Sequence, residues 1–184
     1  MIRKFFPVAI LSIFVLLSAG GCACKYGNQP YVWDGNLVPV SYSIADSLES
    51  NLRTPLARED TLLVASFVNV DDLGQSSTFG RMIAEQVASR FAQKGYSIHE
   101  MKLRQDSVFI QEGKGEFLLS RDLRDISVQY NASAVVVGTY AESNDRVYVT
   151  ARIVRPADSV VIASHDVGIP MDGRTMSLVL RSDR

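Results

Sequence analysis

Two segments of the chain are apolar on both of their alternating faces: residues 61–70, TLLVASFVNV, and residues 134–140, AVVVGTY. A strand with this pattern is buried on both sides, so the sheet that contains it needs a covering layer on each face. The two segments therefore predict a sheet with helices packed on it.

Three segments carry apolar residues at helical spacing and are predicted to form helices: residues 41–53, 77–94 and 120–130. Gly95 and Asn131 follow the second and third of them, and both residue types readily end helices. The residues predicted to face the core share this spacing; they are Ile44, Leu48, Leu52, Phe79, Met82, Ile83, Val87, Phe91, Leu123, Ile126 and Tyr130.

The remaining elements follow from alternation and turn signals. Residues 96–104 are predicted to form a strand that makes a β-α-β unit with the first strand. Short turns then separate three strands of an antiparallel meander with one face partly solvated, residues 134–140, 146–154 and 159–167. We expect a loop at 105–118 and an edge strand or docking segment within 170–184. The predicted order is α-β-α-β-α-β-β-β, an α/β (α+β) domain with a mixed β-sheet.

The first residues of the chain have the parts of an export signal. Arg3 and Lys4 supply positive charge, and an apolar run of about 13 residues follows from Phe5 to Leu17. This run is shorter than the roughly 20 residues that a membrane-spanning helix needs. Small residues then lead to Cys22. The segment is therefore predicted to be a cleaved signal rather than a permanent membrane span.

Residues 19–22 (AGGC) resemble a bacterial lipobox, in which leucine is the commoner first residue. The resemblance implies a diacylglycerol thioether on Cys22, cleavage directly before it and acylation of the new amino group. Two or more acyl chains hold a protein stably on a membrane, whereas one chain holds it only marginally. Two other interpretations stay open: a plain signal peptide with a coincidental cysteine, and acylation of Cys24.

These features divide the chain into a signal peptide, a lipidated cysteine with its tether, and one α/β domain, at residues 1–21, 22–40 and 41–184. By resemblance to enteric sorting, Ala23 permits transfer to the outer membrane, which leaves the domain facing the periplasm. Three tether aromatics are expected to rest at a lipid interface, to dock on a partner or to pack back on the domain: Tyr26, Tyr31 and Trp33.

Composition excludes several classes of function. The chain has 19 Lys+Arg against 20 Asp+Glu residues, so no basic excess is available to neutralise nucleic-acid phosphates. His99 and His165 belong to no pair with metal-ligand spacing. Residues 113–115 (GKG) lack the spacing of a phosphate-binding loop, and no nucleophile elbow is present. We therefore expect no catalytic residue, no cofactor and no metal.

One acidic pair, Asp71-Asp72, comes directly after the first predicted strand. Ligands collect at the carboxyl ends of strands in open α/β sheets, so the pair is a candidate for Mg²⁺ binding with help from Ser76 or Ser77. A Mg²⁺ site needs oxygens from separate segments, and the sequence offers no second acidic cluster. The alternative is a turn whose Asp and Ser side chains cap the following helix.

Several stretches together carry a family resemblance: 66–73 (SFVNVDDL), 75–81 (QSSTFGR), 85–86, 95–96, 119–123 (LSRDL), 136–140 (VVGTY) and 147–154 (VYVTARIV). On these stretches the chain resembles the FlgO family of flagellum-associated outer-membrane lipoproteins over roughly residues 61–168. More distantly it resembles the N-terminal domain of TolB and the CsgG-type lipoproteins.

The FlgO resemblance implies a non-enzymatic role in flagellar assembly or motility at the outer membrane, with envelope or flagellar proteins as partners. Self-association into a homo-oligomer is expected by analogy with flagellar rings and CsgG-type pores. The residues that match the most recognisable family motif are interpreted as a shaped turn between strand and helix or as a contact surface; they are Asp71, Asp72, Ser76, Ser77, Gly80 and Arg81.

Three alternatives belong to other classes of function. A CsgG-like secretion pore needs long alternating hairpins, whereas the longest strands expected here have about nine or ten residues. An activator of cell-wall synthesis would work through a flexible tether, and this tether is short. An enzyme or nucleotide-binding protein would use the edge of the sheet near Asp71.

Overall fold

The structure is a computed structural model that describes residues 33–74, 76–101, 109–112, 116–119 and 121–181. They belong to one compact unit, Trp33–Arg184. The expectations for the signal peptide, Cys22, Cys24, Tyr26, Tyr31 and residues 113–115 lie outside the described residues. The elements are α1 (Leu37–Ser50), β1 (Thr61–Ala65), β2 (Val68–Asn69), α2 (Thr78–Gln93), β3 (Ser97–Met101), β4 (Phe109–Glu112), β5 (Glu116–Leu119), α3 (Arg121–Gln129), β6 (Ala134–Glu142), β7 (Arg146–Arg155), β8 (Val160–Pro170) and α4 (Gly173–Val179).

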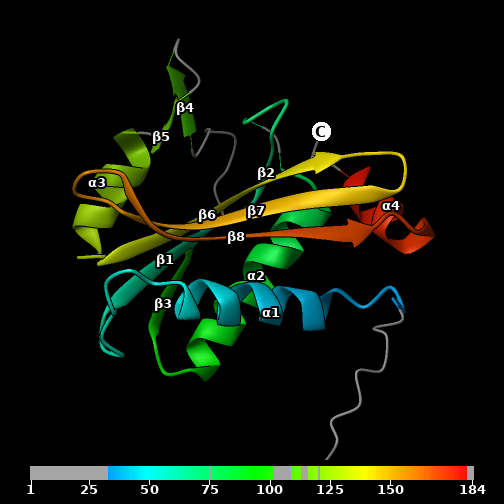
Figure 1. The fold of residues 1–184 in the computed structure, drawn as a ribbon. Helices are drawn as coiled ribbons and strands as arrows, with labels where there is room; N and C mark the ends of the chain where they lie inside the picture. The colour runs from blue at the N-terminus through cyan, green and yellow to red at the C-terminus, as the bar shows by residue number, and fades with distance from the viewer. Residues whose placement is uncertain (1–32, 75, 102–108, 113–115, 120, 182–184) are drawn as a thin grey trace, which may run out of the picture. The chain divides into compact units, whose positions relative to one another are not determined.

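The main sheet has the strand order β3-β1-β6-β7-β8, and β2 pairs with β6 beyond the end of β1 (Figure 1). β1 is parallel to both of its neighbours, β3 and β6. β7 is antiparallel to both of its neighbours, β6 and β8. The predicted β-α-β unit and the predicted meander are both present, so the expected α/β class with a mixed sheet is confirmed.

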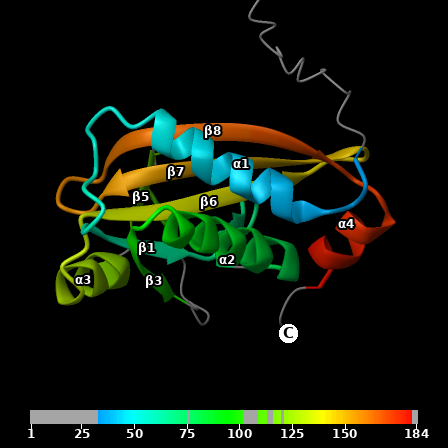
Figure 2. The same ribbon diagram turned by 90° about the horizontal axis from the view of Figure 1, so that it is seen from below.

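Helices α1 and α2 cover one face of the sheet, and Figure 2 shows both of them lying across it. The larger core lies between these helices and the sheet and includes Ile44, Phe79 and Ile153. On the opposite face, Leu123 of α3 belongs to a smaller core with Val135 of β6. β1 and β6 are buried on both faces because they lie in the middle of this arrangement, as their apolar sequences predict.

Residues 61–70 form two strands, so the prediction of one continuous strand was wrong. Ser66 and Phe67 interrupt it, and the backbone of Phe67 bonds to the start of α2 instead of to a strand. Its N–H donates to the carbonyl oxygen of Gly80 over 3.4 Å, and its own carbonyl oxygen accepts from Ser76 Oγ at 2.7 Å. The interruption is a point of contact between the sheet and α2.

Helix α1 begins at Leu37, four residues before the predicted start. Asn36 is the N-cap, and its side-chain oxygen accepts the backbone N–H of Val38 at 3.1 Å. Pro39 lies in the first turn, where its missing N–H costs no helical hydrogen bond. Pro39 therefore does not delay the start of α1.

The ends of the other two predicted helices agree with the sequence. Gly95 has φ +93° after α2, and Asn131 has φ +47° after α3. Both are in the left-handed region that ends a helix. Tyr130 was predicted to face the core, but it is exposed and its ring lies 4.7 Å from the ring of His99, centroid to centroid. The Tyr130 ring therefore packs against His99 of β3 rather than against the core.

Part of the predicted loop at 105–118 is strand, so that expectation was wrong: β4 and β5 pair antiparallel in a separate two-stranded sheet. Within 170–184 the alternative of an edge strand was wrong, because the segment forms the helix α4, which packs on the domain through Thr175 and Val179. Asp172 caps α4, since its Oδ1 accepts the backbone N–H groups of Arg174 at 3.1 Å and Thr175 at 2.7 Å. An aspartate before an apolar run was the sequence signal for this helix.

Candidate functional site

The acidic pair Asp71-Asp72 lies exposed in the connection between β2 and α2. Asp72 Oδ1 accepts the backbone N–H of Gly74 at 3.1 Å, and the N–H of Asp71 donates to Asn69 Oδ1 at 2.9 Å. Among the residues that the structure describes, no group of three or more His, Cys, Asp or Glu side chains is placed to hold a metal ion. The contacts of this pair are those of a turn.

The hydroxyls of both serines in the motif, Ser76 and Ser77, make hydrogen bonds within the domain. The Ser76 hydroxyl donates to the carbonyl oxygen of Phe67, as described above. Ser77 is the N-cap of α2 and is buried; its Oγ accepts the backbone N–H of Gly80 at 3.3 Å. The Ser76 hydroxyl therefore holds the start of α2 against the interruption between β1 and β2, and the Ser77 hydroxyl caps the first turn of α2.

Two glycines make room for Phe67. A Cβ atom on Gly80 would collide with the Phe67 carbonyl oxygen, and one on Gly138 would collide with the Phe67 ring. Phe67 is fully buried, so the ring cannot leave this place without opening the core. The glycine of the family motif is thus explained by a close approach of two backbones.

Tyr140 of β6 contacts the start of α2 through both its hydroxyl and its ring. Its hydroxyl oxygen accepts the backbone N–H of Ser77 at 3.2 Å, and its ring meets Phe79 edge-on with centroids 5.5 Å apart. Burial raises the pKa of the Tyr140 hydroxyl above its ordinary value. The neutral hydroxyl satisfies a backbone donor at the start of α2.

Arg81 closes the motif on its outer side. Its Nη1 donates to the carbonyl oxygen of Ser76 and its Nη2 to Thr78 Oγ1, each over 3.2 Å. The N–H of Thr78 donates to the carbonyl oxygen of Arg181, just after α4, at 2.7 Å. We call residues 76–81 the clasp, because they fasten α2 to the sheet and to the C-terminal segment.

The structure places all six predicted motif residues in the connection between β2 and α2 and in the first turn of α2. Ser76, Ser77, Gly80 and Arg81 make bonds or contacts within the domain, which favours the interpretation as a shaped turn. Asp71 and Asp72 are the members of the set that are exposed. A contact surface at this motif is therefore limited to the acidic pair.

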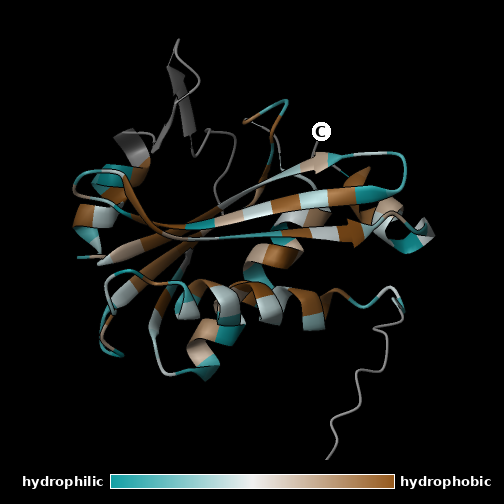
Figure 3. Cartoon of the chain, viewed as in Figure 1, coloured by the Kyte–Doolittle hydropathy of each residue, from teal (hydrophilic) through white to brown (hydrophobic). Residues whose placement is uncertain are grey.

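A different surface is exposed among the residues that the structure describes, and the sequence did not identify it as a site. It lies on the sheet face opposite α1 and α2, and we call it the open sheet face: Tyr148, Thr150 and Arg152 of β7 with Ser164 and Asp166 of β8. Tyr148 is 54% exposed. Thr150 pairs with Asp166 and Arg152 with Ser164 across the two strands. The alternation of apolar and polar residues along β7 is the sequence signal that could have found this face. Figure 3 shows it as alternating bands of hydropathy along the strand.

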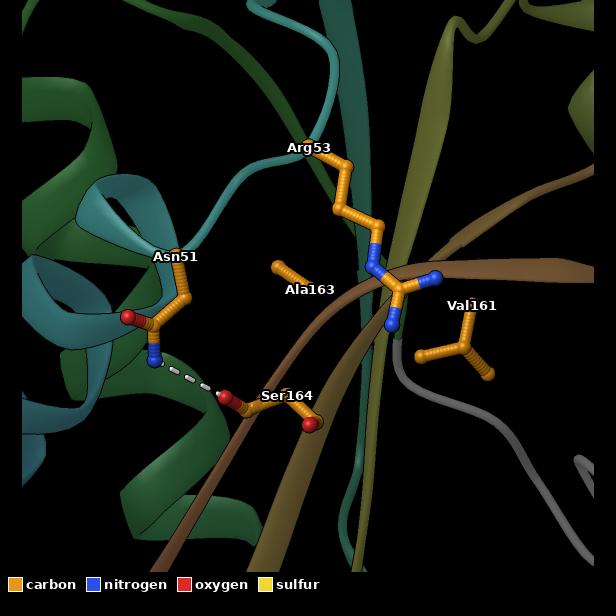
Figure 4. A pocket seen from close by; sticks show the side chains of 5 residues that line it. All are labelled: Asn51, Arg53, Val161, Ala163 and Ser164. Carbon is orange, nitrogen blue, oxygen red and sulfur yellow. Dashed lines mark hydrogen bonds between the residues drawn. The ribbon is translucent and has the colours of Figure 1, made fainter.

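One hollow of about 320 Å³ lies beside β8, lined by Asn51, Arg53, Val161, Ala163 and Ser164. Figure 4 shows Asn51 donating to the carbonyl oxygen of Ser164, a bond of 3.1 Å. The backbone N–H of Arg53 donates to Ile162 at 3.0 Å, so this segment covers part of the sheet edge. The lining contains a single charged side chain and presents no set of groups for catalysis.

An ionic cluster joins α1 to the end of α2. Arg90 donates to both carboxylate oxygens of Asp46 at 2.9 Å, and Lys94 pairs with Asp46 at 2.9 Å and with Glu49. The hydrogen bond from Arg90 lowers the pKa of Asp46. Burial acts to raise the pKa of Glu49, but hydrogen bonds led by that from Lys94 outweigh it and lower the value. The cluster holds the two helices together.

In the part of the chain that the structure describes, none of the helices has the length and apolar character needed to cross a membrane.

A family model with the description "FlgO protein" matches residues 42–174 of the chain. The match extends from the first half of α1 to the first turn of α4 and so includes the clasp and the open sheet face. No curated protein matches the chain significantly.

Among solved structures, the C-terminal domain of LpoB from Salmonella enterica matches with a TM-score of 0.50 and 12% identity, over 77% of this chain and 100% of that one. A PelC dodecamer from Paraburkholderia phytofirmans has a TM-score of 0.44 and 15% identity, over 68% and 84% of the two chains. A lipoprotein from Neisseria meningitidis has a TM-score of 0.41 and 16% identity, over 62% and 81%. At these identities the likeness to the LpoB domain shows a shared fold.

Proposed function

The chain belongs to the FlgO family, and we propose on this basis that it is a flagellum-associated lipoprotein of the outer membrane. Acyl chains on Cys22 hold it there, and its domain faces the periplasm. The domain works by binding other envelope proteins and carries out no chemistry of its own. The observation that carries this proposal is the family match over residues 42–174.

The N-terminal sequence supports the proposal independently, because it lies outside the matched residues. Residues 1–21 have the charge, apolar run and small-residue exit of an export signal, and Cys22 follows directly. Several acyl chains provide a stable anchor without any spanning helix.

The open sheet face is the surface that we assign to the partner. It combines an exposed aromatic side chain, Tyr148, with a cation, Arg152, and an anion, Asp166. Tyr and Arg are enriched among the residues that carry binding energy in protein interfaces. In the clasp, by contrast, the hydroxyls of Ser76 and Ser77 already make hydrogen bonds within the domain.

The anchor is tested by a pair of cysteine variants. Cys22→Ser is expected to release the protein from the outer-membrane fraction and to leave it without acyl mass, whereas the control Cys24→Ser keeps both. Full outer-membrane association and unchanged mass in Cys22→Ser would overturn the anchor at this residue. The reverse result for the two variants would move it to Cys24.

The partner is tested by a photo-crosslinking residue placed at Tyr148, with a matched site at the exposed Ser89 of α2 on the other side of the domain. We expect Tyr148 alone to capture a component of the flagellar basal body, and deletion of the gene to reduce swimming. Capture of cell-wall synthases only, with normal swimming, would replace the flagellar role by activation of wall synthesis. Conductance of the purified protein in a planar bilayer would favour a secretion pore.

A further inference from the structure

The start of the described chain is bound to the last helix. Trp33 Nε1 donates to Asp172 Oδ2 at 2.9 Å, and Arg174 Nη1 donates to the carbonyl oxygen of Asp34 at 2.6 Å. Gly35 has φ +79° and lies against the Arg174 side chain, where a Cβ atom would be crowded. Trp33 and Asp34, just before α1, therefore bond to α4 and its N-cap.

This junction is close to the acylation site along the chain. Eleven peptide steps separate Cys22 from Trp33, so even a fully extended chain between them spans no more than about 40 Å. If Cys22 carries the lipid, Trp33 and the N-cap of α4 to which it bonds stay within about that distance of the bilayer. A short tether gives a weak second contact a high effective concentration.

Helix α4 presents two large apolar side chains to solvent. Leu180, its C-cap, is 71% exposed and Met176 is 46% exposed. They are four positions apart and so lie on one side of the helix, while Thr175 and Val179 are buried against the domain. The family match ends at residue 174, so this pair lies beyond the matched segment.

We infer that Met176 and Leu180 rest in the headgroup region of the bilayer that the acyl chains of Cys22 enter. The inference rests on the lipid anchor of the proposed function. A lipid surface is the occupant because the anchor places one within reach of α4, and apolar side chains gain by leaving water at such a surface.

The contact would also orient the domain. The backbone N–H of Met171 donates to the carbonyl oxygen of Asp145 at 2.8 Å, and that of Thr78 donates to Arg181. The turn between β6 and β7 and the start of α2 therefore lie at the same end of the domain as α4, which Figure 2 also shows. This end would face the membrane.

A coupled-vesicle experiment tests the inference apart from acylation in the cell. The mature chain with Cys24→Ser is joined through the Cys22 thiol to a maleimide lipid in phosphatidylethanolamine–phosphatidylglycerol vesicles. Its single tryptophan, Trp33, gives a background fluorescence that is measured on the parent chain and subtracted. Leu180→Trp adds a reporter at α4, and Val128→Trp adds a matched one at a residue of α3 that is 79% exposed.

We expect brominated lipids to quench the added signal of Leu180→Trp at least about twofold and to leave that of Val128→Trp unchanged. Equal quenching of both reporters, or quenching of neither, overturns the membrane contact. A concentration-dependent dimer of the uncoupled chain that Met176→Ser/Leu180→Ser abolishes assigns the surface to a second copy instead. None of these results depends on whether the cell acylates Cys22, which the fractionation of Cys22→Ser decides separately.

Discussion

The carbonyl oxygen of Phe67 lies too close to the position at which Gly80 would carry a Cβ atom for that atom to fit. The sheet and the first turn of α2 meet there at the distance of two bare backbones. The same carbonyl oxygen accepts a hydrogen bond from the Ser76 hydroxyl. The residue that interrupts the strand is therefore also a point at which the clasp is bonded to the sheet.

Gly80→Ala is expected to destabilise the domain by about 3 kcal/mol, because neither backbone can move away without breaking bonds around Phe67. Gly173→Ala is the matched control, since a Cβ at Gly173 meets nothing within 4 Å. Urea unfolding of the two variants measures the difference. Equal midpoints would show that the approach of α2 to Phe67 is not tight.

Gly138→Ala is expected to cost about 2 kcal/mol by pushing against the Phe67 ring. Phe67→Leu alone loses buried ring contacts, but in the double variant the smaller side chain leaves space for the new methyl group. In a double-mutant cycle, the double variant should therefore lose about 1 kcal/mol less stability than the sum of the two single losses. Additive losses would mean that the glycine and the ring act independently.

Tyr140→Phe removes the acceptor for the Ser77 N–H and is expected to cost about 1–2 kcal/mol, since a buried donor is left unpaired. Tyr148→Phe removes the same hydroxyl from the open sheet face and should change stability by less than about 0.5 kcal/mol. Thermal unfolding compares the two. A neutral Tyr140→Phe would indicate that water or another group replaces the hydroxyl.

Acid should weaken the joint between α1 and α2. The pKa values of Asp46 and Glu49 are lowered in the folded protein from 3.8 and 4.5, so their stabilising contribution is complete above these values. It is lost as the pH falls through the lower folded values, because the unfolded chain then binds protons first. Glu49→Gln is expected to cost about 1–2 kcal/mol at neutral pH and to flatten this dependence, measured by urea unfolding between about pH 7 and 3. Glu59→Gln, at an exposed position, is the control for the cost at neutral pH and should change stability by less than about 0.5 kcal/mol.

Local sequence patterns predicted most of the elements. The apolar runs in β1 and β6 specify strands that need cover on both sides, and the helical spacing of residues such as Phe79 and Phe91 specifies α2. Gly95 and Asn131 mark helix ends through their own backbone preferences. These signals lie within a few residues of the structure that they specify, so no partner is needed to interpret them.

The sequence by itself determined the fold class and the family motif as a unit, and it predicts the export signal, because each depends on residue types at short spacing. Only the tertiary structure decided which motif side chains point inward, because the partners lie far away along the chain. Ser77 and Tyr140 are 63 positions apart, Thr78 and Arg181 are 103 apart, and Trp33 and Asp172 are 139 apart. The tertiary structure also decided the interruption at Phe67, which depends on a bond to Ser76, and the open sheet face, which the pairing of β7 with β8 brings together.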